Sequence, residues 1–483
     1  MERLARIYML GAGGVRRSSD TMTKDVHGEP MAAVDRAWLE MDEPHNPMVV
    51  SAILELADVD DIEQLSRRLL EGLLRYRRFS QRADDHKTGL FWRDDGPLTV
   101  AYHLRIYHLN EDSPEHDLRH AVARELAAAL DRAMPLWRMT FFVRKSGQVT
   151  VLFRAHHAVA DGIALIRVLM SCTDDALAPA ESTGGARHHG PLARLIDGLE
   201  TVNRQLESVQ QLIREDLRHP AQIVDQLRTS RAVMAAAGRV LSLPDDNPAC
   251  FRRPLNGQRA VAWTRGIEFA PIKRYARRHA IKINDVFVSA LAGAFTRYLR
   301  RTHADAAQWH NLRISVPVNL RGENDGELGN RFGLVLLDLP LGVEDLDERL
   351  RLVTERAQAL KHSPEARATL IGLGAAGHMP LALEKRLVNL LADKAAAVVS
   401  NLPGPQQELR FAGSRLTSVV FWPPQTGHIG IGVSLFSYAG HVSVGVSSDI
   451  ALIPDPETLI ADFELELAGM LRPRRRRAAT MRR

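Results

Sequence analysis

The sequence contains little cysteine, few aromatic residues and no long apolar run, and these absences exclude several classes of protein. Among 483 residues only two are cysteines, Cys172 and Cys250. Two cysteines cannot form a disulfide framework, and neither has Cys or His neighbours at a spacing that usually holds zinc. We therefore expect a cytoplasmic protein without a bound metal.

Membrane-spanning helices are not expected, because no stretch of about 18 residues is both apolar and uncharged. A shorter apolar run, residues 7–15, lies between Arg6 and Arg16, and no small-residue cleavage site follows it. This pattern argues against a secretory signal. Any contact with a membrane is therefore predicted to be peripheral.

The positive charge belongs to one end of the chain. The formal net charge is +5, but residues 472–483 contain seven arginines and no acidic residue, and without them the charge is −2. Such a tail fits attraction to anionic lipid, at about 1 kcal/mol per basic residue near the surface. It fits a solvated, disordered end equally well. Nucleic-acid binding has no other feature in its favour and is not expected.

The length and composition predict a globular protein with more than one core. The chain is 45% apolar and 25% charged, and it exceeds the roughly 100–200 residues of a usual domain. We expect a flexible extension (1–30), a first domain (31–180), a linker with long amphipathic helices (181–250), a second domain (251–471) and an arginine-rich tail (472–483).

Hydrophobic periodicity predicts a mixed α/β fold of two halves joined by helices. Helical spacing of apolar residues predicts helices, and alternating or continuous apolar runs bounded by turn residues predict strands. The expected helices are residues 34–41, 60–76, 116–133, 191–219, 220–241, 272–279, 284–301, 343–360 and 364–391, and the expected strands are residues 48–56, 138–144, 149–155, 260–269, 311–318, 427–437 and 441–447.

The stretch His156-His157-Ala158-Val159-Ala160-Asp161-Gly162 follows the second strand of a predicted hairpin and precedes a helical pattern. Side chains at the centre of such a junction project into a cleft. Histidine is a competent general base, because its unperturbed pKa of about 6.5 leaves it mostly neutral at cytoplasmic pH. Adjacent side chains at the end of a strand point to opposite sides, so only one of His156 and His157 can face a given reactant.

Asp161 and Gly162 close this motif. We expect the Asp161 carboxylate to hold the turn by pairing with an arginine or with backbone donors. Gly162 would supply either a permissive dihedral angle or room for a ligand. Two alternatives stay open: the histidine pair is structural or at the surface, or the His-x3-Asp spacing holds a metal. The metal is less favoured, because no third ligand is close in sequence.

The seven-residue motif resembles the active-site signature of the coenzyme-A-dependent acyltransferase superfamily, which includes chloramphenicol acetyltransferase-like enzymes and peptide-synthetase condensation domains. Within residues 31–471, further stretches resemble those of bacterial wax ester synthase/diacylglycerol acyltransferases, in the same order. They are Pro135-Leu136-Trp137, Asn284-Asp285, Ser315-Val316-Pro317-Val318-Asn319-Leu320-Arg321, Leu328-Gly329-Asn330-Arg331-Phe332-Gly333 and Ser400-Asn401-Leu402-Pro403-Gly404-Pro405.

The resemblance implies two chloramphenicol-acetyltransferase-like domains with mixed sheets, flanking helices and an active-site tunnel between them. It also implies that His157, beside His156, is the general base and that Asp161 is mainly structural. Asn284 is a candidate for positioning the oxyanion or the substrate, and Asp285 for holding the start of a helix through the helix dipole. An ordinary helix cap without a chemical role is the alternative for this last pair.

The remaining candidate binding residues follow the shared motifs. The first group, before the hairpin, is expected to pack, with the apolar wall of an acyl channel or direct contact with the substrate as alternatives. The second is expected to form a turn that closes the tunnel, and the third lies in a segment with the composition of a loop. They are Pro135, Leu136 and Trp137; Gly329 and Asn330; and Ser400 and Asn401.

The function implied by the resemblance is direct transfer of a long-chain acyl group from acyl-CoA to diacylglycerol or a fatty alcohol. No cofactor is implied, since acyl-CoA is a substrate. A water-insoluble acceptor predicts peripheral association with the inner membrane or with lipid droplets. Pro423-Pro424 departs from the family pattern, so the acceptor is left open. The alternatives are an enzyme of the superfamily that acylates a polar, sugar or peptidolipid alcohol, and a non-catalytic lipid-droplet or membrane-binding protein.

Overall fold

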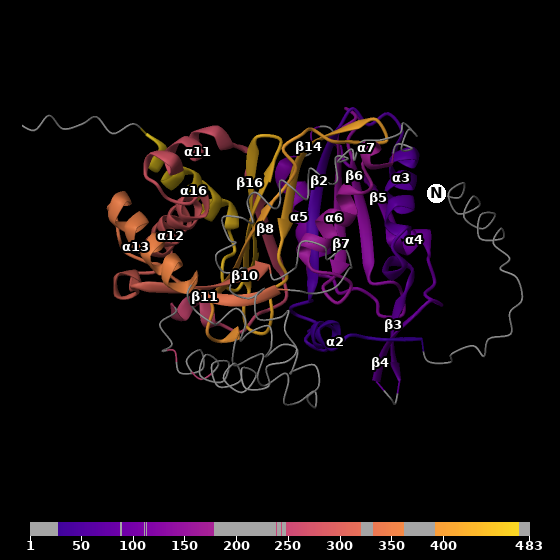
Figure 1. The fold of residues 1–483 in the computed structure, drawn as a ribbon, viewed down its shortest axis with the longest axis horizontal. Coiled ribbons are helices and arrows are strands. Elements are labelled where there is room, and N and C mark those ends of the chain that lie inside the picture. The colour runs from indigo at the N-terminus through magenta and orange to yellow at the C-terminus, as the bar shows by residue number, and fades with distance from the viewer. Residues whose placement is uncertain are drawn as a thin grey trace, which may run out of the picture.

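The computed structural model describes residues 28–86, 89–110, 112, 114–177, 238, 243, 248–319, 332–361 and 392–472 (Figure 1). Most of the predicted extension (1–30) and of the predicted linker (181–250) lies outside these residues. So do the predicted helix at 364–391 and the tail beyond residue 472.

A mixed sheet of six strands combines strands from the first and the second half of the chain. Only its β5–β6 pair is parallel. Residues alternate between its two faces. Val151 and Phe153 of β7 join the core that contains helices α3 (Ile62–Leu74) and α6 (Gly162–Met170), whereas Leu152 joins a second cluster that contains α5 (Glu115–Ala127). In spatial order the strands are β13 (Arg410–Phe411), β14 (Ser414–Trp422), β2 (Val49–Ala57), β7 (Val149–His156), β6 (Trp137–Val143) and β5 (Leu104–His108).

Two of these strands come from the second half of the chain. Strand β14 pairs antiparallel with β2, with Val420 opposite Ile53 and Trp422 opposite Ser51. The periodicity predicted no strand here. The predicted second domain, residues 251–471, therefore contains residues that belong to the sheet of the first half.

The second sheet is also mixed, because β12 pairs parallel with both β10 and β15. The loop predicted at residues 400–405 is wrong up to Pro403, where β12 ends. The apolar residues just before Ser400 bury the start of this strand, and only the Gly404-Pro405 step behaves as its composition indicates. In spatial order the strands are β11 (Phe332–Pro340), β10 (Asn311–Asn319), β12 (Ala397–Pro403), β15 (Ile431–Tyr438), β16 (His441–Asp449) and β8 (Arg259–Trp263), and β9 (Ile267–Glu268) pairs with β16.

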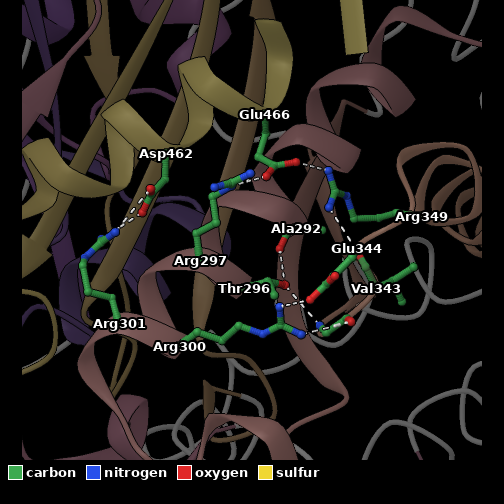
Figure 2. A network of polar contacts seen from close by, with 11 residues as sticks. Ala292, Thr296, Arg297, Arg300, Arg301, Val343, Glu344, Arg349, Asp462 and Glu466 are labelled. Carbon is green, nitrogen blue, oxygen red and sulfur yellow. Dashed lines mark hydrogen bonds and ion pairs between the residues drawn. The ribbon is translucent and has the colours of Figure 1, made fainter. Parts of the chain in front are cut away.

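Four helices lie beside this second sheet: α11 (Phe269–Arg278), α12 (Ile283–Thr302), α13 (Leu346–Lys361) and α16 (Pro456–Leu471) (Figure 1). Figure 2 shows the ionic network that joins three of them. Glu466 of α16 accepts hydrogen bonds from Arg297 of α12 and from Arg349 of α13. Gly293 of α12 gives this network its space, because a Cβ there would lie 2.6 Å from the Arg349 guanidinium.

The predicted helix at 116–133 is too long, since α5 ends at Ala127. The next residues form a turn in which the Asp131 carboxylate accepts the N–H of Ala133 at 2.9 Å. The other described elements are α2 (Ala33–Glu40), α3 (Ile62–Leu74), α4 (Val100–His103), α5 (Glu115–Ala127), α6 (Gly162–Met170) and α7 (Asp174–Leu177), the small sheet of β1 (Glu29–Pro30), β4 (Gly89–Arg93) and β3 (Arg82–His86), and three 3₁₀ turns (Arg77–Ser80, Ala249–Arg252, Ala306–Gln308).

A hydrophobic cluster joins the two halves. It combines Ile53 and Leu152 of the first sheet, Val122 of α5, Trp422 of β14 and Trp263 of β8. The rings of Trp263 and Trp422 meet edge to face, with centroids 5.8 Å apart. None of the helices in the described part of the chain has both the length and the apolar character to cross a membrane.

The junction cluster gives a stability prediction. We expect Trp422→Ala to lower the free energy of unfolding by about 3–5 kcal/mol, because truncating a buried aromatic leaves a cavity. Urea unfolding followed by circular dichroism measures the change. Leu465→Ala is the control, since this leucine is 59% exposed and should change the free energy by less than about 0.5 kcal/mol. A loss of under about 1 kcal/mol for Trp422→Ala would contradict the packing described here.

Candidate active site

The seven-residue motif lies at the strand-to-helix junction that the sequence predicted. Strand β7 ends at His156 and helix α6 begins at Gly162. Both histidines are buried, with exposed fractions of 1% for His156 and 5% for His157. This burial argues against the alternative that the histidine pair lies at the surface.

Asp161 is the N-cap of α6. Its carboxylate accepts the backbone N–H of Ala164 at 3.0 Å, so the expected pairing with backbone donors is present. Gly162 is not one of the described glycines with a positive φ. A permissive dihedral angle therefore does not explain why glycine occupies this position. A Cβ there would lie 3.4 Å from Leu402 of β12 and 3.9 Å from Phe421 of β14. The start of α6 therefore faces elements of the second half.

His157 is held by its backbone and by one aromatic ring. Its N–H donates to the carbonyl of Met48 at 2.7 Å. Its imidazole lies 4.5 Å from the ring of Trp38, between centroids, at an interplanar angle of 32°. Trp38 belongs to α2 and was not among the predicted site residues. Its only signal in the sequence is an apolar position on a short amphipathic helix.

His156 has a different set of contacts. Its N–H donates to the carbonyl of Leu136 at 2.9 Å, and its Nδ1 accepts the N–H of Ala158 at 3.0 Å. Its Nε2 lies 3.7 Å from a carboxylate oxygen of Asp42. Asp42 was also missed, because nothing in the sequence around it indicates a partner more than a hundred residues away.

Leu136 and Trp137 lie beside the motif, and neither side chain has any exposed surface. The Trp137 indole N–H donates to the carbonyl of Phe79 at 2.8 Å. Its ring stacks on His103, with centroids 4.4 Å apart. Of the three roles expected for Pro135-Leu136-Trp137, these contacts favour packing that supports the end of β7.

The structure brings Asn284 and Asn401 together. The Asn401 amide donates to the side-chain oxygen of Asn284 at 3.1 Å. Asp285 accepts the N–H of Lys282 at 3.3 Å, as a carboxylate in the first turn of a helix does. Ser400 is buried and lies opposite Ser434 in the second sheet. Asn401 lies on β12, the strand whose Leu402 faces Gly162, and Asn284 lies in the first turn of α12.

The predicted pair Gly329 and Asn330 lies outside the described residues. Among the residues that are described, no group of three or more histidine, cysteine, aspartate or glutamate side chains could hold a metal ion.

Comparison with known families agrees with this geometry. Residues 31–287 match the wax ester synthase/diacylglycerol acyltransferase catalytic domain, and residues 328–471 match the WS/DGAT C-terminal domain. A Mycobacterium tuberculosis protein named as a diacylglycerol O-acyltransferase is 28% identical, over 88% of this chain and 87% of the relative. The O-acyltransferase WSD of Acinetobacter baylyi is 22% identical, over 91% of this chain and 96% of the relative.

Solved structures share the fold. The wax ester synthase/diacylglycerol acyltransferase from Marinobacter aquaeolei VT8 superposes with a TM-score of 0.63 and 19% identity, covering 91% of this chain and 98% of that chain. The first condensation domain of the CDA synthetase gives a TM-score of 0.58 and 15% identity, covering 93% of this chain and 96% of that chain. The expected mixed fold of the chloramphenicol acetyltransferase type is confirmed.

The histidine stacked on Trp137 makes the fold sensitive to acid. Burial, with Arg138 nearby, lowers the pKa of His103 to about 4, against about 6.5 in the unfolded chain. Between these values the unfolded state binds more protons, so the free energy of unfolding falls as the pH drops from about 6.5 towards 4, by about 2 kcal/mol at pH 5. We expect His103→Asn to remove most of this loss, measured as the difference in Tm between pH 7.5 and pH 5.

The control for this measurement is His441→Asn. His441 is exposed and its ring contacts a backbone carbonyl, as that of His103 does. This variant should keep the wild-type difference in Tm. If His103→Asn keeps it as well, the acid sensitivity does not come from His103.

Proposed function

The chain belongs to the wax ester synthase/diacylglycerol acyltransferase family, and we propose that it transfers an acyl group from acyl-CoA to the hydroxyl of diacylglycerol or of a long-chain alcohol. The observation that carries the proposal is the buried His157 at the junction of β7 and α6, within the region that matches the catalytic domain of the family. The names of relatives over most of the chain support the same reaction.

In this reaction His157 acts as the general base. Its imidazole takes the proton from the acceptor hydroxyl while the oxygen attacks the carbonyl carbon of the thioester. The tetrahedral intermediate then collapses, the carbon–sulfur bond breaks, and the thiolate of coenzyme A takes the proton from the imidazolium. The products are an ester and free coenzyme A. No covalent acyl-enzyme is formed, and no cofactor takes part.

The asparagine pair supplies the polar contact that the developing negative charge needs. Because the Asn284 oxygen accepts from Asn401, the amide group of Asn284 is turned to donate elsewhere, and no described residue accepts from it. We assign it to the oxyanion or to a substrate carbonyl. Asp161 has no chemical step in this scheme and orders the start of α6 through its backbone hydrogen bond.

The test of the base is His157→Ala. Loss of a general base costs roughly 10²-fold or more in rate, so we expect kcat to fall by about that factor with palmitoyl-CoA and either dioleoylglycerol or hexadecanol. Release of coenzyme A measures the rate. Replacing the exposed His120 by alanine is the control and should leave the rate unchanged. Undiminished ester formation by His157→Ala would overturn the assignment of the base.

A screen of acceptors in the same assay separates this function from its alternatives. Activity confined to polar, sugar or peptidolipid alcohols would favour another enzyme of the superfamily, whose fold the condensation domains share. No release of coenzyme A with any acceptor would favour a non-catalytic binding protein.

A lipid acceptor requires that the protein meet a lipid surface, so we place it in the cytoplasm, peripherally bound to the inner membrane or to lipid droplets. Helix α11 supports this placement. Its apolar side packs inward through Ile272, while Arg274, Arg277 and Arg278 are exposed and form no ion pair with described residues. Helix α16, which leads into the arginine-rich tail, contacts α11 (Figure 1).

The basic surface of α11 gives a binding prediction. We expect the triple variant Arg274→Glu, Arg277→Glu, Arg278→Glu to bind vesicles of anionic phosphatidylglycerol at least tenfold more weakly than wild type. The reason is that each basic residue near such a surface contributes about 1 kcal/mol. Co-sedimentation at low and high salt measures the binding, with and without the residues after 472.

A matched control makes the same change of charge elsewhere. Arg75, Arg124 and Lys145 are exposed residues of the first half, and their triple replacement by glutamate should bind like wild type. Equal weakening by both triple variants would show that net charge, and not the surface of α11, governs the binding.

A further inference from the structure

One short segment contacts both histidines of the motif. This segment, residues 42–48, connects α2 to β2 and begins with Asp42, whose carboxylate accepts the N–H of Met48 at 2.8 Å. The carbonyl of Met48 in turn accepts the N–H of His157 at 2.7 Å. Asp42 therefore holds the residue that holds His157, and it also lies beside the ring of His156.

The hydrogen bond from Ala158 fixes the tautomer of His156. A backbone N–H can only donate, so the Nδ1 that receives it at 3.0 Å carries a lone pair. In the neutral ring the proton must then be on Nε2, which is the nitrogen that lies 3.7 Å from Asp42. His156 thus presents a donor to Asp42, and its basic nitrogen is already occupied.

The charge around Asp42 keeps it ionised. Burial raises the pKa of its carboxyl, but His156, the N–H of Met48 and Arg132 together bring this pKa below its ordinary value. Arg132 lies 3.5 Å from the second carboxylate oxygen and also donates to the carbonyl of Leu39 at 2.7 Å. One carboxylate therefore joins α2, the 42–48 segment and the end of β7.

The same segment is tied to the second half of the molecule through Asn46, which is 1% exposed. The Asn46 amide donates to the carbonyls of Gly427 and Ile429 at 2.9 and 3.0 Å. Its oxygen accepts from Arg259 of β8 at 2.5 Å. The segment that touches both histidines is thus anchored on elements far from them in sequence.

We propose that Asp42 is a positioning residue for the acyl transfer: through His156 and Met48 it fixes the place of the His157 imidazole relative to the second half of the molecule. The proposal rests on the proposed function, because it names the residue that orients the base of that reaction. Asp42 donates no proton and touches no substrate in this scheme. Its effect is on the geometry of the base, where a displacement of about 1 Å can cost 10²-fold in rate.

The first experiment compares Asp42→Asn with Asp174→Asn. Asp174 is a matched control, because its carboxylate also accepts backbone N–H groups across the two halves, from Ala412 and Gly413 at 2.8 Å, and has an arginine 3.7 Å away. We expect Asp42→Asn to lower kcat roughly tenfold or more with KM for acyl-CoA and acceptor unchanged. Asp174→Asn should keep kcat within about twofold, whatever its effect on Tm.

A double-mutant cycle tests the route through His156. Glutamine at position 156 can keep a donor towards Asp42, so His156→Gln should retain more activity than His156→Ala. If Asp42 acts through His156, combining Asp42→Asn with His156→Ala should cost less than the product of the two single losses. Wild-type kcat for Asp42→Asn, or losses that multiply in the double variant, would overturn the proposal.

A spectroscopic arm keeps the proposal testable without turnover. In protein labelled with ¹⁵N-histidine, His156 should show an unprotonated Nδ1 and a protonated Nε2, with His156→Gln and His157→Ala identifying the signals. Asp42→Asn should shift the ring signals of both histidines, and Asp174→Asn should shift neither. If wild type releases no coenzyme A with any acceptor, the proposed function fails, while unchanged His157 signals in Asp42→Asn would reject the positioning role itself.

Discussion

The pairing of β2 with a strand on each side is the constraint from which the site follows. On one side β2 pairs with β7, placing His156 opposite Val49, and on the other it pairs with β14 from the second half, placing Trp422 opposite Ser51. The histidine pair and the last residue of β14 therefore meet at the beginning of the same strand. A shift of this register by one residue would turn every side chain of β2 to the opposite face, and Ile53 would leave the cluster that joins the halves.

Polar groups are buried at this meeting point at a cost in free energy. Arg259 illustrates the cost, because burial lowers its pKa to about 10, with Asp449 partly offsetting the effect. Buried ionic groups contribute little net stability, and apolar residues of similar volume often serve as well. The directionality of hydrogen bonds therefore explains the presence of Asp42, Asn46 and Arg259 better than a gain in stability does. Hydrogen bonds fix atoms at defined angles, and apolar packing does not.

Local features of the fold could be predicted from the sequence. The hairpin that leads into the motif, the junction at Gly162 and the N-cap at Asp161 depend on neighbours within a few residues, and periodicity and turn chemistry report such neighbours well. The resemblance added the pair Asn284 and Asn401, which the structure brings into contact.

The parts of the fold and of the site that the sequence did not predict depend on partners far away in the sequence. Strand β14 has a bulge at residues 416–418, which breaks the alternation that would have marked it as a strand. Asp42 and Asn46 are single polar residues whose partners are more than a hundred and more than two hundred residues distant. Trp38 looked like an ordinary core position. No local pattern distinguishes such residues from solvated ones, so the motif could be predicted while its supports could not.

The chemistry gives a reason why β14, from the second half of the chain, pairs with β2 of the first half. An acyl transfer between two substrates requires that a thioester, a hydroxyl and an imidazole be aligned at once, and much of the rate comes from holding them so. In this molecule the second half of the chain contacts both the helix that follows the histidine pair and the 42–48 segment that holds this pair. Leu402 and Phe421 face the start of α6, and Asn46 is held by Arg259 and by the carbonyls near residue 428. A hinge between the halves would move the base and the asparagine pair apart. The pairing of β14 with β2 along their length instead keeps these groups at fixed relative positions.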